Sequence, residues 1–455
     1  MLPERFREIF ASEWGADECN ALCEALEAPA TVSVRIHPKK GRTPAGATPI
    51  PWSQYGYYLP ERPIFTTDPA FHAGAYYVQE PSSQFVGRLL DSAVGDSSHI
   101  RLLDLCAAPG GKTTLYSSAL GDRGLVVANE INRQRAAALT DNVRKWGEGN
   151  VVVTCNDPAH FAGFEGWFDV VAVDAPCSGE GMFRRIPESR DEWSPGNVTL
   201  CAQRQLKILN DIWPSLRAGG TLIYSTCTFN RTEDEGVLRQ FQEEFGGQIE
   251  AAPEVAVDPA WGIVTGREGT WQTFRFFPHR ARGEGFFAAI IRKSDNAPQK
   301  SRTPKSRRRI IERVDRRTAG ELSRWVTRPE TMEWYSAGDS LYGSPVTWAE
   351  DIRTIAESLS TIHSGVRMGQ IFKGELKPDH SLAMYVGLNR AAANCTEVGL
   401  PQALDYLKRA ALTPGPDMSE GINLLTYEGL ALGWIKRVGN RTNNLYPNSL
   451  RILNF

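Results

Sequence analysis

The spacing of apolar residues near the start of the chain predicts helices followed by short strands. Within residues 1–30, apolar positions recur with helical spacing and predict one or two amphipathic helices that end near Pro29. The segment VSVRIHP (32–38) alternates with a period of two and predicts a short strand. Residues 41–63 are rich in proline, glycine and aromatic residues, which predicts a loop that covers a small strand-bearing module.

From residue 100 onward, apolar runs typical of buried strands alternate with helical patterns. Strands are predicted over residues 100–107, 125–130, 151–155, 169–176 and 221–228. Helices are predicted over 132–147 and 198–220, the second closed by Gly219 and Gly220. Strands that alternate with helices form a parallel, doubly wound sheet, so we expect an α/β Rossmann-like core. Two later runs, 270–280 and 285–293, predict an antiparallel hairpin at the sheet edge.

Length and changes of composition predict more than one domain. A chain of 455 residues exceeds what a single hydrophobic core normally supports. We expect an N-terminal α+β module over 1–71, the doubly wound core over 72–293, a polar and basic linker over 294–318, and a mixed α/β domain over 319–455.

The overall composition excludes several classes of protein. Hydrophobic residues make up 41% of the chain and charged residues 23%, as in ordinary globular proteins. No apolar run is long enough for a membrane helix, and the start MLPERFREIF lacks the features of a secretory signal. The eight cysteines show no paired CxxC spacing, which argues against a zinc or other metal site and against a disulfide framework. We therefore expect a cytoplasmic protein, where a free thiol can act as a nucleophile.

Charge is distributed unevenly along the chain. The net charge is only -2, yet nine Lys or Arg residues lie between Lys300 and Arg317, against two acids, Glu312 and Asp315. Such a run can neutralise the phosphates of a nucleic acid. A solvated interdomain linker is an equally good interpretation.

The segment DLCAAPGGKTT (104–114), at a predicted strand-to-helix junction, favours a cofactor pocket. A triphosphate-binding loop would need a glycine where Cys106 stands, so we set that interpretation aside. A nucleoside cofactor with an amino-acid carboxylate fits better, because a helix N-terminus attracts anions. Glu130, which closes the second strand, can accept ribose hydroxyls, and Asp157, after the third, can accept an adenine amino group. Each acid alone is more often a turn residue.

Two further strand ends carry reactive groups. The fourth strand ends in DAPCSGEG, with Asp174 and Cys177, and the fifth ends in YSTCT, with Cys227. The carboxyl ends of neighbouring parallel strands share one crevice, so both thiols can face the cofactor. One thiolate can add to a poorly nucleophilic ring while the second acts as a base, and Lys112 is a candidate source of positive potential. For the remaining thiols we prefer a role as small buried hydrophobes: Cys19, Cys23, Cys155, Cys201 and Cys395.

The motifs resemble those of a known family. AAPGGKT (107–113), DAPCSGEG (174–181) and STCT (225–228), preceded by HAGAYYVQEPSS (72–83), are similar to the motifs of the Sun-type RNA cytosine-5 methyltransferases, which include the nucleolar Nop proteins. DNA cytosine-5 enzymes also have a Pro-Cys thiol, but there it is the nucleophile. The presence of Thr226-Cys227 beside Pro176-Cys177 favours the RNA family.

The resemblance implies a reaction and a role for each site residue. S-adenosyl-L-methionine would supply a methyl group for carbon 5 of cytosine. Cys227 would attack carbon 6, Cys177 would release the product, and Asp174 would contact base and cofactor. The cofactor-binding residues would be Cys106, Ala107, Ala108, Pro109, Gly110, Gly111, Lys112, Thr113, Glu130, Asp157 and Asp174.

The resemblance also implies an RNA partner. The N-terminal module would bind RNA, and the C-terminal region resembles the PUA-like module of bacterial members that act on small-subunit rRNA. We expect rRNA or the small ribosomal subunit as partner, no membrane, and a monomer. The same chemistry on tRNA is a close alternative. A non-catalytic RNA-binding assembly factor is a third, although it predicts eroded cysteines.

Two further groups of residues are candidates to contact the substrate. Phe183, Arg184 and Arg185 follow the Pro-Cys loop and either hold the target strand or form an ordinary solvated loop. A second group either closes over the active site or packs a domain junction: His72, Tyr76, Tyr77, Gln79 and Glu80.

Overall fold

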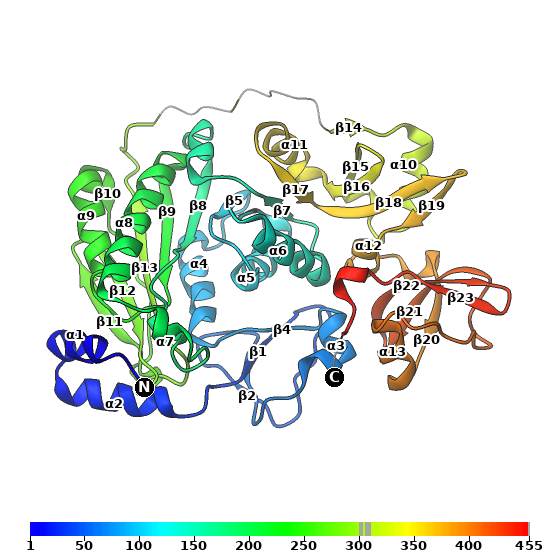
Figure 1. The fold of residues 1–455 in the computed structure, drawn as a ribbon. Helices are drawn as coiled ribbons and strands as arrows, with labels where there is room; N and C mark the ends of the chain where they lie inside the picture. Colours follow the sequence, from blue (N-terminus) through cyan, green and yellow to red (C-terminus); the bar gives the residue numbers. More distant parts are fainter. Residues whose placement is uncertain (300–303, 305–310, 454–455) are drawn as a thin grey trace.

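A computed structural model of the chain describes residues 1–299, 304 and 311–453. Figure 1 shows a broad central sheet with helices on both sides. The two N-terminal helices lie at one end of the molecule, and the last β-sheet lies at the other. The basic run 300–317 falls mostly on residues outside the described ranges, so its role as a linker stays a prediction. Among the described residues, no helix combines the length and apolar character that crossing a membrane requires.

A ten-stranded sheet forms the core of the described molecule. Its parallel strands are β5 (Ile100–Asp104), β6 (Gly124–Asn129), β7 (Val151–Thr154), β8 (Phe168–Asp174) and β9 (Leu216–Thr226). Their order is β7-β6-β5-β8-β9, so the winding direction reverses between β5 and β8. Ligands bind at such a reversal, beyond the carboxyl ends of the strands. The predicted Rossmann-like core is confirmed.

Alternate residues of these strands bury opposite faces of the sheet. Leu102 and Val126 pack under α4 (Val86–Val94), α5 (Gly111–Leu120) and α6 (Arg133–Trp146). Leu103 and Val127 pack under α8 (Pro195–Ile212) and α9 (Glu235–Phe245). This two-sided burial explains why the strands are apolar throughout.

The predicted hairpin after residue 270 is confirmed, although it does not form the edge of the sheet. β12 (Trp271–Phe276) pairs antiparallel with β13 (Phe286–Lys293), which adjoins β9. β11 (Val264–Glu268) lies outside β12, and β10 (Ile249–Glu250) pairs with β13.

The predicted helix over 198–220 is wrong at its end. Helix α8 stops at Ile212, a 3₁₀ turn covers Trp213–Ser215, and residues from Leu216 belong to β9. Pro214 has no backbone N–H and disfavours helix at the residue before it, which ends the helix early. Gly219, with φ 71°, lies where the register between β8 and β9 shifts, so it marks a bulge rather than a helix cap.

The N-terminal part forms its own small sheet beside the carboxyl edge of the core. The helices α1 (Glu4–Trp14) and α2 (Ala16–Glu27) are those predicted. They precede β1 (Ser33–Ile36), β2 (Thr48–Pro49), β3 (Gly56–Tyr58), α3 (Pro69–His72) and β4 (Tyr76–Val78). The strand order is β2-β3-β1-β4.

The C-terminal part contains two further sheets. One contains β14 (Glu312–Arg313), β15 (Met332–Ala337), β16 (Ser340–Pro345), β18 (Val366–Phe372) and β19 (Glu375–Pro378). The other contains β20 (Asn394–Glu397), β21 (Gly421–Tyr427), β22 (Leu430–Val438) and β23 (Arg441–Asn444). The helices of the C-terminal part are α10 (Arg316–Ser323), α11 (Ala349–Ser358), α12 (His380–Met384) and α13 (Leu400–Leu407).

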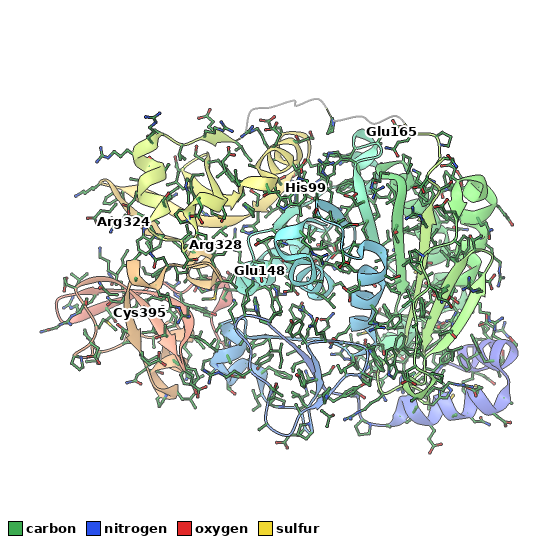
Figure 2. The ribbon with its side chains drawn as sticks, turned by 180° about the vertical axis from the view of Figure 1, so that it is seen from behind. His99, Glu148, Glu165, Arg324, Arg328 and Cys395 are labelled. Carbon is green, nitrogen blue, oxygen red and sulfur yellow. The ribbon has the colours of Figure 1, made fainter. Side chains whose placement is uncertain are left out.

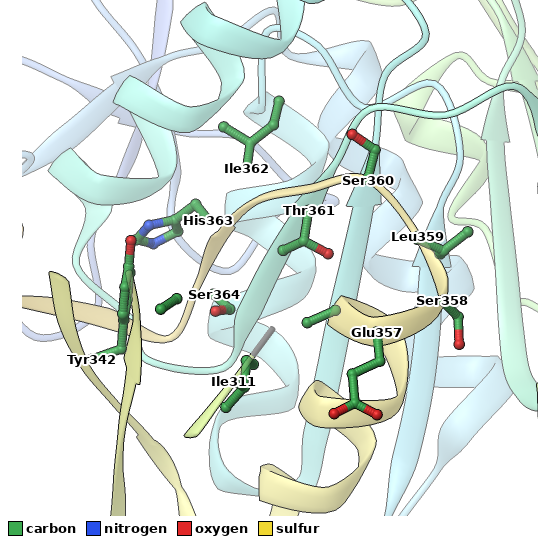
Figure 3. Close-up of a pocket in the computed structure, with 12 residues that line it drawn as sticks. Ile311, Tyr342, Glu357, Ser358, Leu359, Ser360, Thr361, Ile362, His363 and Ser364 are labelled. Atoms are coloured by element: carbon green, nitrogen blue, oxygen red, sulfur yellow. The ribbon is translucent and has the colours of Figure 1, made fainter. Parts of the chain in front are cut away.

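One strand of the C-terminal part belongs to the central sheet. β17 (Thr361–Ser364) pairs antiparallel with β7 and forms the edge of the ten-stranded sheet. Figure 3 shows the chain leaving α11 and entering this strand. The cavity drawn there, about 460 Å³, is lined by none of the predicted site residues.

Candidate active site

The predicted cofactor loop, Cys106–Thr113, connects β5 to α5 at the carboxyl edge of the sheet. Gly110 has φ 109°, a conformation that favours glycine, and a Cβ there would meet Leu139 Cδ1 at 3.1 Å. Helix α5 begins at Gly111, so its first free N–H groups can receive a carboxylate. Thr113 Oγ1 donates to Asp104 Oδ2 over 2.6 Å, and burial raises the pKa of Asp104 to about 7. Burial also raises the pKa of Cys106, which therefore keeps its proton.

Glu130 supplies the best test of whether the pocket fits a nucleoside. Its carboxylate is buried directly after β6, and Oε1 accepts the N–H of Asn132 at 2.9 Å. Oε2 is buried and accepts no hydrogen bond, although Arg135 Nη1 lies 3.4 Å away. A buried carboxylate oxygen normally has a donor. A ribose hydroxyl would supply one, so the residue fits its predicted role.

Asp157 follows β7 at the same edge of the sheet. It is exposed, and Oδ1 accepts the N–H of Ala159 at 2.9 Å. The sheet register sets Asn129 beside Thr154, so β6 and β7 end at the same height in the sheet and the residues that follow them are neighbours. The predicted acids after the second and third strands therefore lie at neighbouring strand ends.

The two predicted catalytic thiols face each other from the loops that follow β8 and β9. Cys177 Sγ and Cys227 Sγ lie 3.2 Å apart, and both residues are partly exposed. The hydrogen bond with Cys227, reinforced by burial, raises the pKa of Cys177 well above its usual value. The raised pKa favours the protonated form of Cys177, and either sulfur can be the donor across this contact.

Asp174 and Lys112 form an ion pair beside the thiols. Lys112 Nζ lies 2.8 Å from Asp174 Oδ2, and Ser225 Oγ donates to Asp174 Oδ1 over 2.9 Å. Burial by itself lowers the pKa of Lys112, but the charge of Asp174 and their hydrogen bond outweigh it, so the pKa lies above the usual value. The charge of Cys227 acts in the same direction. The ammonium group thus provides positive potential to both the acid and the thiol.

Two buried glutamates that our sequence analysis did not identify hold the cysteine loops together. Glu180, from the Cys177 loop, accepts the N–H groups of Phe229 and Asn230 at 2.8 and 3.0 Å. Glu233, from the Cys227 loop, accepts the N–H of Ser178 at 2.8 Å and also its hydroxyl. Asn230 Nδ2 bridges the two carboxylates at 3.0 and 2.7 Å. We call Glu180, Glu233 and Asn230 the carboxylate clasp.

A second buried network supports the other side of the Cys227 loop. Thr226 Oγ1 donates to Asp234 Oδ1 over 2.6 Å, and Arg275 Nη1 lies 2.5 Å from Asp234 Oδ2. Arg275 Nη2 lies 2.7 Å from Glu235 Oε2. Thr226, the residue before Cys227, is therefore linked through Asp234 to Arg275 on β12.

Several other candidates from the sequence lie outside the site. The prediction that Phe183 holds RNA is wrong, because its ring is fully buried against Phe6. Arg184 donates to Glu284 and to the Gly283 carbonyl, which is a packing role. Cys395, predicted to be buried, is exposed and lies on the C-terminal part in Figure 2.

The residues before the core mostly pack a junction. His72 is buried and contacts Tyr446 Oη, and Tyr76 Oη donates to Asp68 over 2.6 Å. Gln79 accepts from Arg35, and Glu80 accepts the N–H of Ser82. Tyr77 Oη, in contrast, donates to the carbonyl of Pro109 in the cofactor loop over 3.3 Å.

Comparison with known proteins places this site in a family. Residues 93–292 match the family model of the 16S rRNA methyltransferase RsmB/F. Ribosomal RNA small subunit methyltransferase F of Erwinia tasmaniensis is 30% identical over 421 residues, which cover 89% of this chain and 84% of that protein. The chain belongs to the small subunit methyltransferase F family. The resemblance to the Sun-type enzymes, stated from the motifs, is confirmed.

Further matches within the methyltransferase F family extend to both ends of the chain. Residues 2–81 match the N-terminal domain of the 16S rRNA methyltransferase RsmF, and residues 393–452 match the RsmF PUA domain. The methyltransferase F of Salmonella newport is 28% identical, with 98% of this chain and 95% of that protein covered.

Two solved structures share the fold. NSun6 of Pyrococcus horikoshii, determined with SFG, has a TM-score of 0.52, 19% identity, and covers 64% of this chain and 98% of its own. A methyltransferase homologue from the same organism has a TM-score of 0.52, 24% identity, and coverage of 64% and 95%.

Proposed function

We propose that this protein transfers a methyl group from S-adenosyl-L-methionine to carbon 5 of a cytosine in small-subunit ribosomal RNA. The observation that carries the proposal is the 3.2 Å contact between Cys177 and Cys227 beside Asp174. The catalytic unit spans residues 72–293, and the parts over 1–71 and 319–455 bind RNA. We propose further that the protein acts as a monomer.

The residues of the pocket suit a nucleoside cofactor that carries an amino-acid group. The Cys106–Thr113 loop and the start of α5 would receive the amino-acid carboxylate, Glu130 would accept from the ribose, and Asp157 would accept from the adenine. When bound, the cofactor supplies an electrophilic methyl group. Glu130 Oε2 supports this assignment, because it is buried next to Arg135 yet accepts no hydrogen bond, which leaves an acceptor for a hydroxyl.

The first step activates the ring. The thiolate of Cys227 forms a bond to carbon 6, which moves the electrons of the 5,6 double bond onto carbon 5 and makes that carbon nucleophilic. Asp174 holds the ring-nitrogen edge by a hydrogen bond. The Lys112 ammonium, 2.8 Å from Asp174 Oδ2, offsets the negative charge that develops on the ring.

Release follows once carbon 5 carries the methyl group. Bonding of Cys227 to the ring removes the hydrogen bond that is the largest cause of the raised pKa of Cys177. Cys177 can then give its proton to solvent water and, as a thiolate, take the proton of carbon 5. The electrons of that C–H bond restore the double bond, and the bond between carbon 6 and Cys227 breaks.

Substrate and product can be tested together. The purified protein is incubated with tritiated S-adenosyl-L-methionine and, in separate reactions, unmodified 16S rRNA, small ribosomal subunits and tRNA. We expect label in 5-methylcytidine from the rRNA or the subunits. Label in tRNA alone, or in another nucleoside, would contradict the proposal.

A further inference from the structure

A separate cavity lies beside the cofactor loop, between the N-terminal part and α6. Its volume is about 670 Å³, and of the predicted cofactor residues only Pro109 lines it. One wall comes from residues 62–66, Phe71 and residues 77–78, and the other from Pro109, Asn142 and Lys145. Its position next to the loop, but outside the nucleoside pocket, leaves it without a role in the chemistry described above.

The cavity combines aromatic rings with positive charge. Lys145 Nζ lies 3.9 Å from the centre of the Phe71 ring, and the Arg62 guanidinium lies 5.5 Å from that of Phe65. None of the described lining residues is acidic. Aromatic faces that stack bases, next to cations that neutralise phosphates, are the features by which proteins bind single-stranded nucleic acid.

The surface around the cavity also has features of a binding site. Ile64, on its rim, is 64% exposed, which is high for a large apolar side chain. The opposite wall is fixed, because Asn142 Nδ2 donates to the Pro109 carbonyl over 2.9 Å and Tyr77 Oη donates to it over 3.3 Å. A group bound here would lie against the outside of the loop that holds the cofactor.

We propose that this cavity binds an unpaired nucleotide of the RNA substrate, with its base against Phe65 and Phe71 and its phosphate near Arg62 and Lys145. The inference rests on the proposed function for the identity of the RNA. The mixture of stacking surface and net positive charge selects a nucleotide over a neutral apolar ligand.

Binding of RNA to the full chain tests this directly. The probe is a short fluorescein-labelled oligouridylate, followed by anisotropy over a range of salt concentrations. Phe65→Leu keeps apolar packing but removes the ring, and we expect about tenfold weaker binding. Arg62→Met and Lys145→Met should each weaken binding about fivefold and reduce the salt slope by about 0.7, because each removes one phosphate contact. A 4-thiouridine probe should cross-link to the segment containing Phe65 or Phe71.

The control is Arg267→Met on β11, at the opposite edge of the central sheet, where a 57% exposed arginine pairs with Glu254. It should bind the probe like the unaltered protein, and all variants should keep their affinity for S-adenosyl-L-methionine by calorimetry. Unchanged affinity and slope in all three cavity variants would overturn the inference. So would an equal loss of cofactor affinity, since the residues would then act through Pro109. If the unaltered protein binds the probe here but methylates no RNA, only the proposed function fails.

Discussion

Cys177 and Cys227 face each other across 3.2 Å, and this contact can be probed without RNA. The hydrogen bond with Cys227 is the largest cause of the raised pKa of Cys177. Cys227→Ala removes it, so the pKa of Cys177 should fall and its thiolate should form at lower pH. We expect iodoacetamide to alkylate Cys177 faster at a fixed pH near neutrality, with the whole rate profile moved to lower pH.

Mass spectrometry of the peptide that contains Cys177 gives the rate, because it separates this thiol from the other cysteines. Cys201→Ala, which removes a buried thiol on α8, is the control and should leave the profile unchanged. An identical profile in the Cys227→Ala variant would show that the two sulfurs do not interact.

The carboxylate clasp should be needed to hold the Cys177 loop in position. In Glu233→Gln, the side-chain amide cannot accept from both the N–H and the hydroxyl of Ser178 as the carboxylate does. The Cys177 loop should move relative to Cys227, and a displacement of about 1 Å typically lowers the rate about a hundredfold. We expect this loss in kcat with an unchanged cofactor affinity.

Glu243→Gln, an exposed position on α9, serves as the control and should keep full activity. A parallel loss of cofactor affinity in Glu233→Gln would mean general damage to the fold and not a positioning role.

The sequence was most informative where function depends on strand ends. Asp174, Cys177, Cys227 and Glu130 each lie at or directly after the end of a predicted strand, and a parallel sheet brings such ends to one edge. Glu180 and Glu233 could not be assigned this way, because each accepts hydrogen bonds from the loop that carries the other. The acids within SGEG and NRTEDE were visible, but their partners depend on how the loops cross.

At the scale of elements, β17 connects the C-terminal part to the cofactor edge. Asn156 exchanges two hydrogen bonds with the backbone of Ser360, at 3.0 and 3.2 Å. The side-chain amide of Asn129 donates to the backbone carbonyl of Asn156 over 2.9 Å. It also donates to the backbone carbonyl of Leu105 over 3.2 Å. A chain of contacts thus runs from β17 to the start of the cofactor loop.

Asn156→Ala should therefore weaken cofactor binding. The change removes the two side-chain hydrogen bonds with Ser360 and keeps the backbone contact with Asn129. Their loss destabilises this edge by about 1–2 kcal/mol, so we expect cofactor affinity to fall by at most about thirtyfold. Calorimetry with S-adenosyl-L-methionine measures it. Thr361→Ala, on β17 directly after Ser360, is the control, because its hydroxyl is buried without a hydrogen-bond partner. Equal affinity in Asn156→Ala and the unaltered protein would rule out the connection.

Local pattern predicted the individual elements better than their partners. The helix over 132–147 is present as α6, with Asn132 capping its start and Gly147 its end. Strand β17 is only four residues long, and nothing within it identifies β7 as its neighbour. Pairing over such a sequence distance is set by the packing of α11 against the sheet, which a local pattern does not contain.

At the scale of the whole molecule, Lys40 joins three parts of the chain. Its ammonium group donates to the carbonyls of Ala73, Lys145 and Met384 at 3.1, 2.9 and 3.2 Å. These acceptors belong to the N-terminal part, α6 and α12. Figure 2 shows Glu148 at the same junction, and Lys39 Nζ lies 3.0 Å from its carboxylate.

Lys40→Met should lower the stability of the assembled molecule. Three carbonyls lose their donor, and we expect the free energy of unfolding to fall by about 2–4 kcal/mol. Thermal unfolding by calorimetry tests this, with Lys39→Met as the control, because the Lys39 side chain is 55% exposed and its ion pair contributes little. Equal melting temperatures for the two variants would exclude a joining role for Lys40. The sequence predicted several parts but gave no sign of this junction, because its acceptors are backbone atoms.

The division of labour between the two thiols is tested most directly by trapping the RNA. Cys177→Ala can still add Cys227 to cytosine and accept the methyl group, but it cannot release the product. Incubated with small-subunit rRNA and S-adenosyl-L-methionine, it should accumulate a protein–RNA adduct that resists denaturing electrophoresis. The adduct should be absent in the Cys177→Ala/Cys227→Ala double variant. No adduct with Cys177→Ala, or an adduct that persists without Cys227, would contradict the mechanism.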